Sequence, residues 1–181
     1  MLRKRVLYGF MLLLTVMIVA CSSQIENDAR SVSREILRAG SISEAEMCST
    51  FNTLDSLVMP EVFGRDFAME IVQKIENDSI CDAKELNRRV KLLRKCITDK
   101  QGKHNSNLFV AGVQSYVETL SFERKMKLYA KIATPEQLGT ALRVDRYRNE
   151  SDSAEVQQRA DVLKAIYNEA EYSAFLKYYN R

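Results

Sequence analysis

The sequence predicts an all-α protein, and three observations support this fold class. Apolar residues recur at three- and four-residue spacing over most of the chain, which is the period of an amphipathic helix. Only two prolines and six glycines occur in 181 residues, so helix breakers are rare. Long runs that alternate polar and apolar residues, the pattern of a half-buried strand, are absent. We therefore expect a bundle of about six or seven helices.

The first two helices are predicted by their boundary residues. Residues 29–39 form the first helix, which Gly40 ends at a position that favours a left-handed cap. Ser43 and Glu46 have the spacing of a capping box at the start of a second helix. The apolar face of this second helix continues to about Met59, where we expect it to end.

Two further helices follow in the first half of the chain. Pro60 lies where a helix restarts, and a four-residue apolar spacing predicts a third helix over 61–77. Ser79 is expected to open a fourth helix, whose buried stripe runs to Ile97.

The second half begins with a polar stretch at 99–107 that contains one glycine and predicts a loop. Residues 107–133 are again helical in pattern, with a kink or break near Ser121, where the apolar spacing shifts phase. The segment 134–137 reads Thr-Pro-Glu-Gln and predicts the start of a short helix. Residues 149–153 separate it from one long last helix.

The N-terminus has the layout of an export signal. Three basic residues precede an apolar run over residues 6–20, which is shorter than the roughly 20 residues of a transmembrane helix. The last residues of this run and the next one are Ile18, Val19, Ala20 and Cys21. They resemble the lipobox of bacterial lipoproteins. An ordinary signal peptide and an uncleaved anchor are the alternatives.

The lipobox resemblance implies a diacylglycerol on the sulfur of Cys21, cleavage before Cys21 and acylation of the new amino group. Two or more acyl chains give stable membrane anchoring. We therefore expect a signal peptide at 1–20, a lipidated segment with a short helix at 21–42 and a helical domain at 43–181. Ser22 resembles the sorting signal for the outer membrane of Gram-negative bacteria, and leaves open which face of that membrane carries the domain.

The charge balance argues against a nucleic-acid partner. The chain has 27 Lys and Arg against 24 Asp and Glu, and Arg3, Lys4 and Arg5 account for the whole excess. The rest of the chain is neutral and has no overall attraction to a phosphate backbone.

Three Asp-Ser-apolar triplets, at Ser56, Ser79 and Ser153, resemble the O-glycosylation motif of some Gram-negative gut anaerobes. Helix capping by Asp and Ser is the alternative for two of them.

A weak internal similarity relates residues 60–64 to 135–139 and residues 82–93 to 152–163. A duplication would give two tandem three-helix units over 43–100 and 107–181, and convergent capping with a generic amphipathic composition is the alternative.

The residues that carry catalysis are sparse. His104 is the only histidine, which excludes a two-histidine metal motif within one chain. No nucleophile elbow, glycine-rich phosphate loop or Cys-x-x-Cys pair is present. We expect no cofactor and no metal.

Three cysteines remain beyond Cys21. Cys81 and Cys96 lie fifteen residues apart on one predicted helix, roughly 22 Å along its axis, and cannot bond to each other there. Any disulfide must therefore use Cys48, while three buried thiols are the alternative.

Two stretches are candidate interaction surfaces. One is a basic patch at the end of the fourth predicted helix, formed by Arg88, Arg89, Lys91, Arg94 and Lys95. It suits anionic lipid or an acidic partner, although cations also stabilise a helix C-terminus. The other is a C-terminal aromatic cluster of Tyr172, Phe175, Tyr178 and Tyr179, which suits either a docking surface or a core.

The function that these patterns favour is a lipid-anchored, non-enzymatic interaction or accessory protein of the cell envelope. Its expected partners are the membrane, through the N-terminal lipid, and a protein of the envelope. A helical binder of an apolar or glycan ligand is the first alternative. An envelope enzyme acting on glycan or cell wall is the second.

Overall fold

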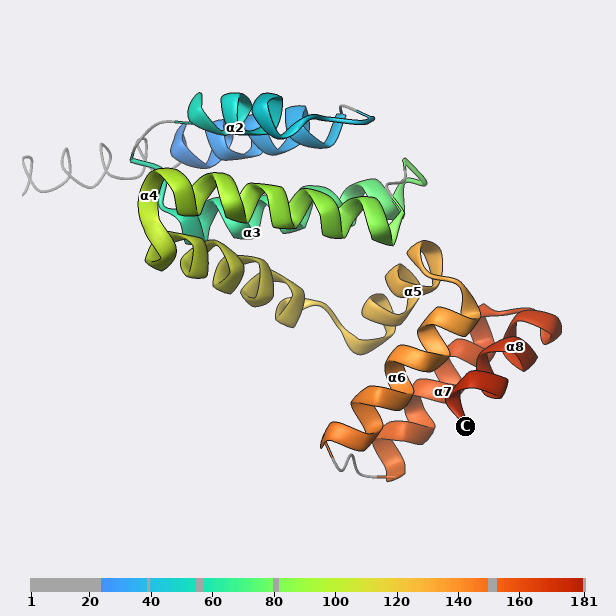
Figure 1. Cartoon of the computed structure of the whole chain (residues 1–181). Helices are drawn as coiled ribbons and strands as arrows, with labels where there is room; N and C mark the ends of the chain where they lie inside the picture. The colour runs from blue at the N-terminus through green and yellow to red at the C-terminus, as the bar shows by residue number, and fades with distance from the viewer. Residues whose placement is uncertain (1–23, 39, 55–56, 80–81, 150–152, 181) are drawn as a thin grey trace, which may run out of the picture. The chain divides into compact units, whose positions relative to one another are not determined.

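The computed structural model describes residues 24–38, 40–54, 57–79, 82–149 and 153–180 (Figure 1). These residues form helices joined by turns and contain no strand, so the predicted all-α class is confirmed. The chain forms two compact units: unit 1 comprises residues 1–70 and 90–116, and unit 2 comprises 71–89 and 117–181. The tandem arrangement suggested by the internal similarity stays a prediction.

Unit 1 begins with a helix over residues 24–38, followed by α2 (Glu44–Asn52). The capping box predicted at the start of α2 is present, since the Ser43 backbone N–H donates to Glu46 and the Glu46 N–H donates to the Ser43 hydroxyl. The helix ends at Asn52 and not near Met59 as expected. The Thr53 backbone N–H donates to carbonyl groups of the last turn of α2. Met59 precedes Pro60, and a residue before a proline disfavours helical backbone.

The long helices α3 (Pro60–Glu76) and α4 (Ala83–Thr119) are joined by a turn. Asp78 adopts a left-handed backbone with φ 55°, and the Ser79 N–H donates to the carbonyl of Lys74 at 2.9 Å. This arrangement closes α3 with a Schellman-type cap. Ser79 therefore lies in a turn and does not open α4 as predicted; the N-cap is Asp82, which accepts from the Glu85 N–H.

A single residue interrupts α4. Residues 99–107 are helical apart from Gly102, so the predicted loop is wrong, although its glycine does break the helix. Gly102 has φ 85° and ψ 170°, a backbone conformation that a residue with a Cβ rarely adopts. The chain bends back at this point (Figure 1), and Arg94 in the first half donates to Ser106 at 3.1 Å in the second half.

The core of unit 1 contains four phenylalanines from three helices. Phe63 and Phe67 of α3 pack against Phe109 of α4, with ring centroids 5.7 and 6.0 Å apart, and Phe51 of α2 lies 5.5 Å from Phe63. All four are buried. Glycines allow α3 and α4 to approach this closely, since a Cβ on Gly64 would overlap the carbonyl oxygen of Phe109.

Unit 2 contains α5 (Phe122–Ile132), α6 (Pro135–Asn149), α7 (Ser153–Ile166) and α8 (Glu169–Tyr179). The predicted break near Ser121 and the predicted helix start at 134–137 are confirmed. The single long last helix is wrong, because Asn168 and Glu171 form a capping box that starts α8 anew. The core comprises Met126, Leu138, Leu142, Leu163, Phe175 and Tyr179.

Polar contacts join α5 to the C-terminal end of α3 within unit 2. Arg124 forms two hydrogen bonds with Glu76, at 2.6 and 2.9 Å. Lys131 donates to the Asp78 carboxylate at 2.8 Å and to the Glu76 carbonyl at 3.0 Å. These donors satisfy carbonyl and carboxylate groups at a helix end, where cations are favoured. None of the helices in the described ranges is both long and apolar enough to cross a membrane.

Candidate functional site

Several predicted site residues lie outside the described part of the chain. These are Cys21, Ser56 and Cys81. Ser79 is described and exposed, in the turn between α3 and α4. Ser153 is the first residue of α7, and its side chain is outside the described set. Glycosylation of these serines stays a prediction.

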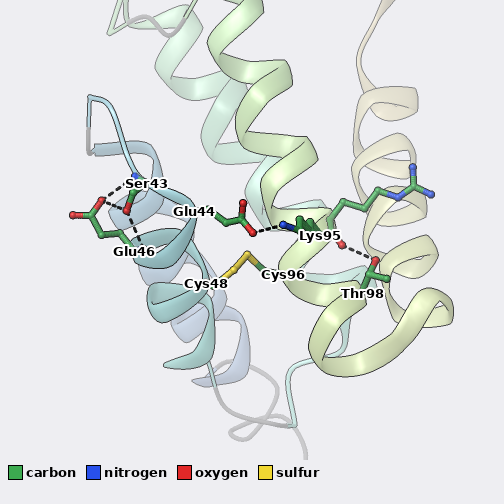
Figure 2. Close-up of a disulfide and its surroundings, with 8 residues drawn as sticks. Ser43, Glu44, Glu46, Cys48, Lys95, Cys96 and Thr98 are labelled. Atoms are coloured by element: carbon green, nitrogen blue, oxygen red, sulfur yellow. Dashed lines mark hydrogen bonds and ion pairs between the residues drawn. A yellow bond between two sulfur atoms is a disulfide. The ribbon is translucent and has the colours of Figure 1, made fainter.

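A disulfide joins Cys48 of α2 to Cys96 of α4, with their Cα atoms 5.4 Å apart (Figure 2). The sequence predicts that any disulfide must include Cys48 but does not predict its partner. In the structure the partner is Cys96. One residue away, Lys95 forms an ion pair with Glu44 of α2 at 2.5 Å. A covalent bond and an ion pair therefore join the same two helices at the same level.

The predicted basic patch is largely neutralised by contacts within the fold. Arg88 and Arg89 both donate to Glu85, at 2.7–2.9 Å, and Arg89 is 1% exposed. The hydrogen bond from Arg88, followed by that from Arg89, lowers the pKa of Glu85 to about 2. Arg94 donates to side chains beyond Gly102, as described above.

Lys95 is paired with Glu44. Among the five residues of the patch, Lys91 is the one exposed cation that has no partner in the contacts described here. Arg89 cannot contribute to a binding surface because it is buried. Most of these cations hold α4 together or attach it to α2, and binding of a partner by this patch stays a prediction.

The C-terminal aromatic cluster is mainly core. Phe175 is fully buried, Tyr179 is 4% exposed, and their rings stack with centroids 5.1 Å apart. Tyr172 is half-buried and stacks on Phe175 at 6.0 Å. Gly139 of α6 permits this packing, since a Cβ there would lie 2.6 Å from the Phe175 carbonyl oxygen. Phe175 and Tyr179 thus face inward, and a docking role for the aromatic cluster stays a prediction.

Among the hollows of the described residues, three are relevant to binding. The first, of about 190 Å³, lies in unit 1 between Phe51, Leu54, Val58, Pro60, Phe63, Asn52, Lys100 and Gln101. The second, here called the α6–α8 groove, is an open depression of about 600 Å³ lined by Glu136, Gln137, Thr140, Ala141, Val144 and Tyr178. The third, of about 400 Å³, lies between α5 and α7.

Sequence reasoning missed two buried carboxylates on α3. Asp66 is 2% exposed and Glu70 is 4% exposed, one helical turn apart. Their partners are Arg30, 3.8 Å from Asp66, and Arg34, 2.9 Å from Glu70, which are likewise one turn apart on the helix over 24–38. We call these two ion pairs the carboxylate ladder. Matching charges at four-residue spacing on both helices were the available signal.

The two rungs of the ladder differ in quality. Glu70 accepts a charge-assisted hydrogen bond, whereas the second oxygen of Asp66, Oδ2, is buried without a hydrogen-bond partner. Burial raises the pKa of Asp66, and the positive charges of Arg30 and Arg65 only partly oppose it. Neither carboxylate lines any of these three hollows.

His104, the one histidine, is exposed on the second half of α4. Within the described ranges, no three His, Cys, Asp or Glu side chains are grouped closely enough to hold a metal ion.

Removing the disulfide is expected to lower stability strongly. The bond spans 48 residues of sequence, and closing a loop of this length stabilises by about 4 kcal/mol through the unfolded chain. A Cys48→Ala/Cys96→Ala variant should lose this amount in urea unfolding. Reductant should have the same effect on the wild type and on Cys81→Ala, and no further effect on the double variant. A wild type indifferent to reductant would contradict the bridge.

The two rungs of the ladder are expected to respond oppositely to neutralisation. Because the folded pKa of Asp66 lies above the ordinary value of 3.8, its charge penalises the folded state above the folded pKa. Asp66→Asn should therefore be at least as stable as the wild type at pH 7, and this difference should shrink as the pH falls through the raised pKa. Glu70→Gln should lose about 1–3 kcal/mol at pH 7, because it weakens a charged hydrogen bond.

Urea unfolding of both variants between pH 4 and pH 7 measures this. The interpretation of Asp66 fails if Asp66→Asn is less stable than Glu70→Gln at pH 7.

Comparison with known proteins assigns the chain to no family. No protein-family model, curated protein or solved structure matches it. Its function must therefore be inferred from its own residues.

Proposed function

We propose that this chain is a lipid-anchored, non-enzymatic helical protein of the bacterial cell envelope, acting as an interaction or accessory subunit. The observation that carries the proposal is the Cys48–Cys96 disulfide. Structural disulfides form in oxidising compartments outside the cytoplasm, the destination that the lipobox-like sequence at Cys21 predicts. Two independent features of the chain, a leader and a cross-link, thus support the same location.

The anchor itself is assigned to Cys21, three residues before the helix over 24–38 begins. Ser22 favours the outer membrane of a Gram-negative bacterium as the destination. The protein would then be attached through acyl chains.

A non-enzymatic role is supported by what the buried polar groups do. Asp66, Glu70 and Arg89 form ion pairs within the fold, Ser33 donates to the Ala29 carbonyl, and Ser106 accepts from Arg94. Perturbed ionisable groups often mark active sites, but structural ion pairs perturb them as well. Each of these groups has its own partner within the fold and none lines the three hollows described above, so a structural role accounts for them.

The α6–α8 groove is the surface that best suits a protein partner. It is open and shallow, and its exposed wall includes Ala141 and Val144, the latter 40% exposed. Small-molecule sites usually enclose most of the ligand, which an open depression does not. The more enclosed hollow in unit 1 is about 190 Å³, below the roughly 300 Å³ of ordinary ligand sites, so a ligand-binding role has less support.

Lipidation has a direct test. The full precursor expressed in a Gram-negative host should incorporate labelled palmitate, and Cys21→Ala should not, because it lacks the sulfur that carries diacylglycerol. Cys81→Ala is the matched control and should label like the wild type. Labelling that persists in Cys21→Ala would refute the anchor.

The partner surface has a second test. Crosslinking of the tagged, lipidated protein in intact envelopes should capture a discrete protein, and Val144→Asp with Ala141→Asp should lose it, because two charges in an apolar groove oppose its desolvation. Tyr129→Asp, at an exposed apolar position on α5, is the control and should retain the partner. A partner captured equally by all variants would exclude the α6–α8 groove.

A further inference from the structure

The ion pairs of the helix over 24–38 fix its direction on α3. Glu26 pairs with Arg65, Arg30 with Asp66 and Arg34 with Glu70. Residue numbers increase together along both helices, so the two helices run parallel. The first residue of the N-terminal helix therefore lies beside the start of α3 at Pro60.

Two other segments meet at this same end of unit 1. The hollow of about 190 Å³ is lined by Phe51 at the end of α2, Pro60 at the start of α3, and Lys100 and Gln101 just before the bend of α4. Figure 1 shows the end of α2, the start of α3 and the bend of α4 gathered at one end of the helices. We call this the anchor end of unit 1.

Large apolar side chains are exposed at the anchor end. Leu57 is 70% exposed and Met59 is 59% exposed, more than the other large apolar residues of the described chain that are exposed. Both lie in the link between α2, which ends at Asn52, and α3, which begins at Pro60. A single exposed leucine is ordinary, but two such side chains beside a partly apolar hollow form a candidate contact surface.

The lysines at the bend suit a lipid surface. Lys100 and Lys103 are exposed on either side of Gly102. Exposed carboxylates at Glu61 and Asp99 offset their charge. Their long apolar stems nonetheless let lysines reach headgroup phosphates from a shallow position. Insertion of apolar side chains, and not net charge, would therefore supply most of the attraction.

The length of the chain sets how far this end can be from the lipid. Residue 24 comes three positions after Cys21, and a fully extended chain spans about 3.6 Å per residue. The Cα of Cys21 therefore lies within about 11 Å of the Cα of residue 24, the first residue of the helix that begins beside Pro60.

We propose that the anchor end of unit 1 lies against the bilayer, with Leu57 and Met59 inserted among the lipid headgroups and Lys100 and Lys103 at their level. This inference rests on lipidation of Cys21, and it adds a second contact that orients unit 1 on the membrane. The acyl chains supply the attachment, and the apolar tip restricts how the unit tumbles about it.

The chain contains no tryptophan, so a single introduced one is a clean probe. Leu57→Trp reports on the anchor end. Ser41→Trp is the matched control, because Ser41 is exposed beyond the opposite end of a helix about 21 Å long. Each variant is produced from the full precursor, purified in lipidated form and reconstituted into phosphatidylethanolamine–phosphatidylglycerol vesicles. Flotation reports the anchor, and quenching by brominated acyl chains reports insertion.

The expected result is that both variants float, that brominated lipid quenches most of the Leu57→Trp emission, and that Ser41→Trp emission is unchanged. Adding Met59→Asp to Leu57→Trp should reduce the quenching without preventing flotation. Circular dichroism checks that each variant is folded.

Flotation with no quenching of Leu57→Trp would overturn the orientation and leave the anchor standing. A blue-shifted emission without quenching would also overturn it, since a protein surface or a second copy would then cover the tip. Failure to float would refute the anchor, and the inference with it.

Discussion

The close approach of α3 to the second half of α4 is the constraint on which unit 1 depends. Gly64 lies against the Phe109 carbonyl, and Gly112 lies against the Glu61 carbonyl, so neither helix can carry a side chain at its contact point. This spacing lets the rings of Phe63, Phe67 and Phe109 meet in one cluster. The bend at Gly102 is what brings the second half of α4 to α3.

The polar contacts fix the direction and register of packed helices, which apolar packing alone does not determine. Apolar faces tolerate sliding, whereas ion pairs at matched four-residue spacing favour one alignment. The carboxylate ladder does this for the helix over 24–38, and the Cys48–Cys96 bond with its neighbouring ion pair does it for α2 on α4. Because one oxygen of Asp66 is buried without a hydrogen-bond partner, we infer that this rung stabilises the fold less than the Glu70 rung does.

Local signals in the sequence predicted local structure well. Several predicted features depend only on neighbouring residues, because caps form within one turn. They are the capping boxes at 43–46 and 134–137, the helix start at Pro60 and the break near Ser121. The capping box at Asn168 was equally local and was overlooked within a continuous apolar pattern. Features that depend on distant residues could not be read: the burial of Arg89, the pairing of Asp66 with Arg30, and the choice of Cys96 by Cys48.

The candidate site was harder to predict than the fold for the same reason. Basic and aromatic clusters in sequence resemble binding surfaces, but their availability depends on which partners the fold brings to them. Glu85, Glu44 and Ser106 engage most of the basic cluster, and α6 covers Phe175. The exposed apolar residues Leu57 and Met59 were instead expected inside a helix. Because α2 ends at Asn52, the chain that links it to α3 leaves them in solvent, at the end nearest the proposed lipid.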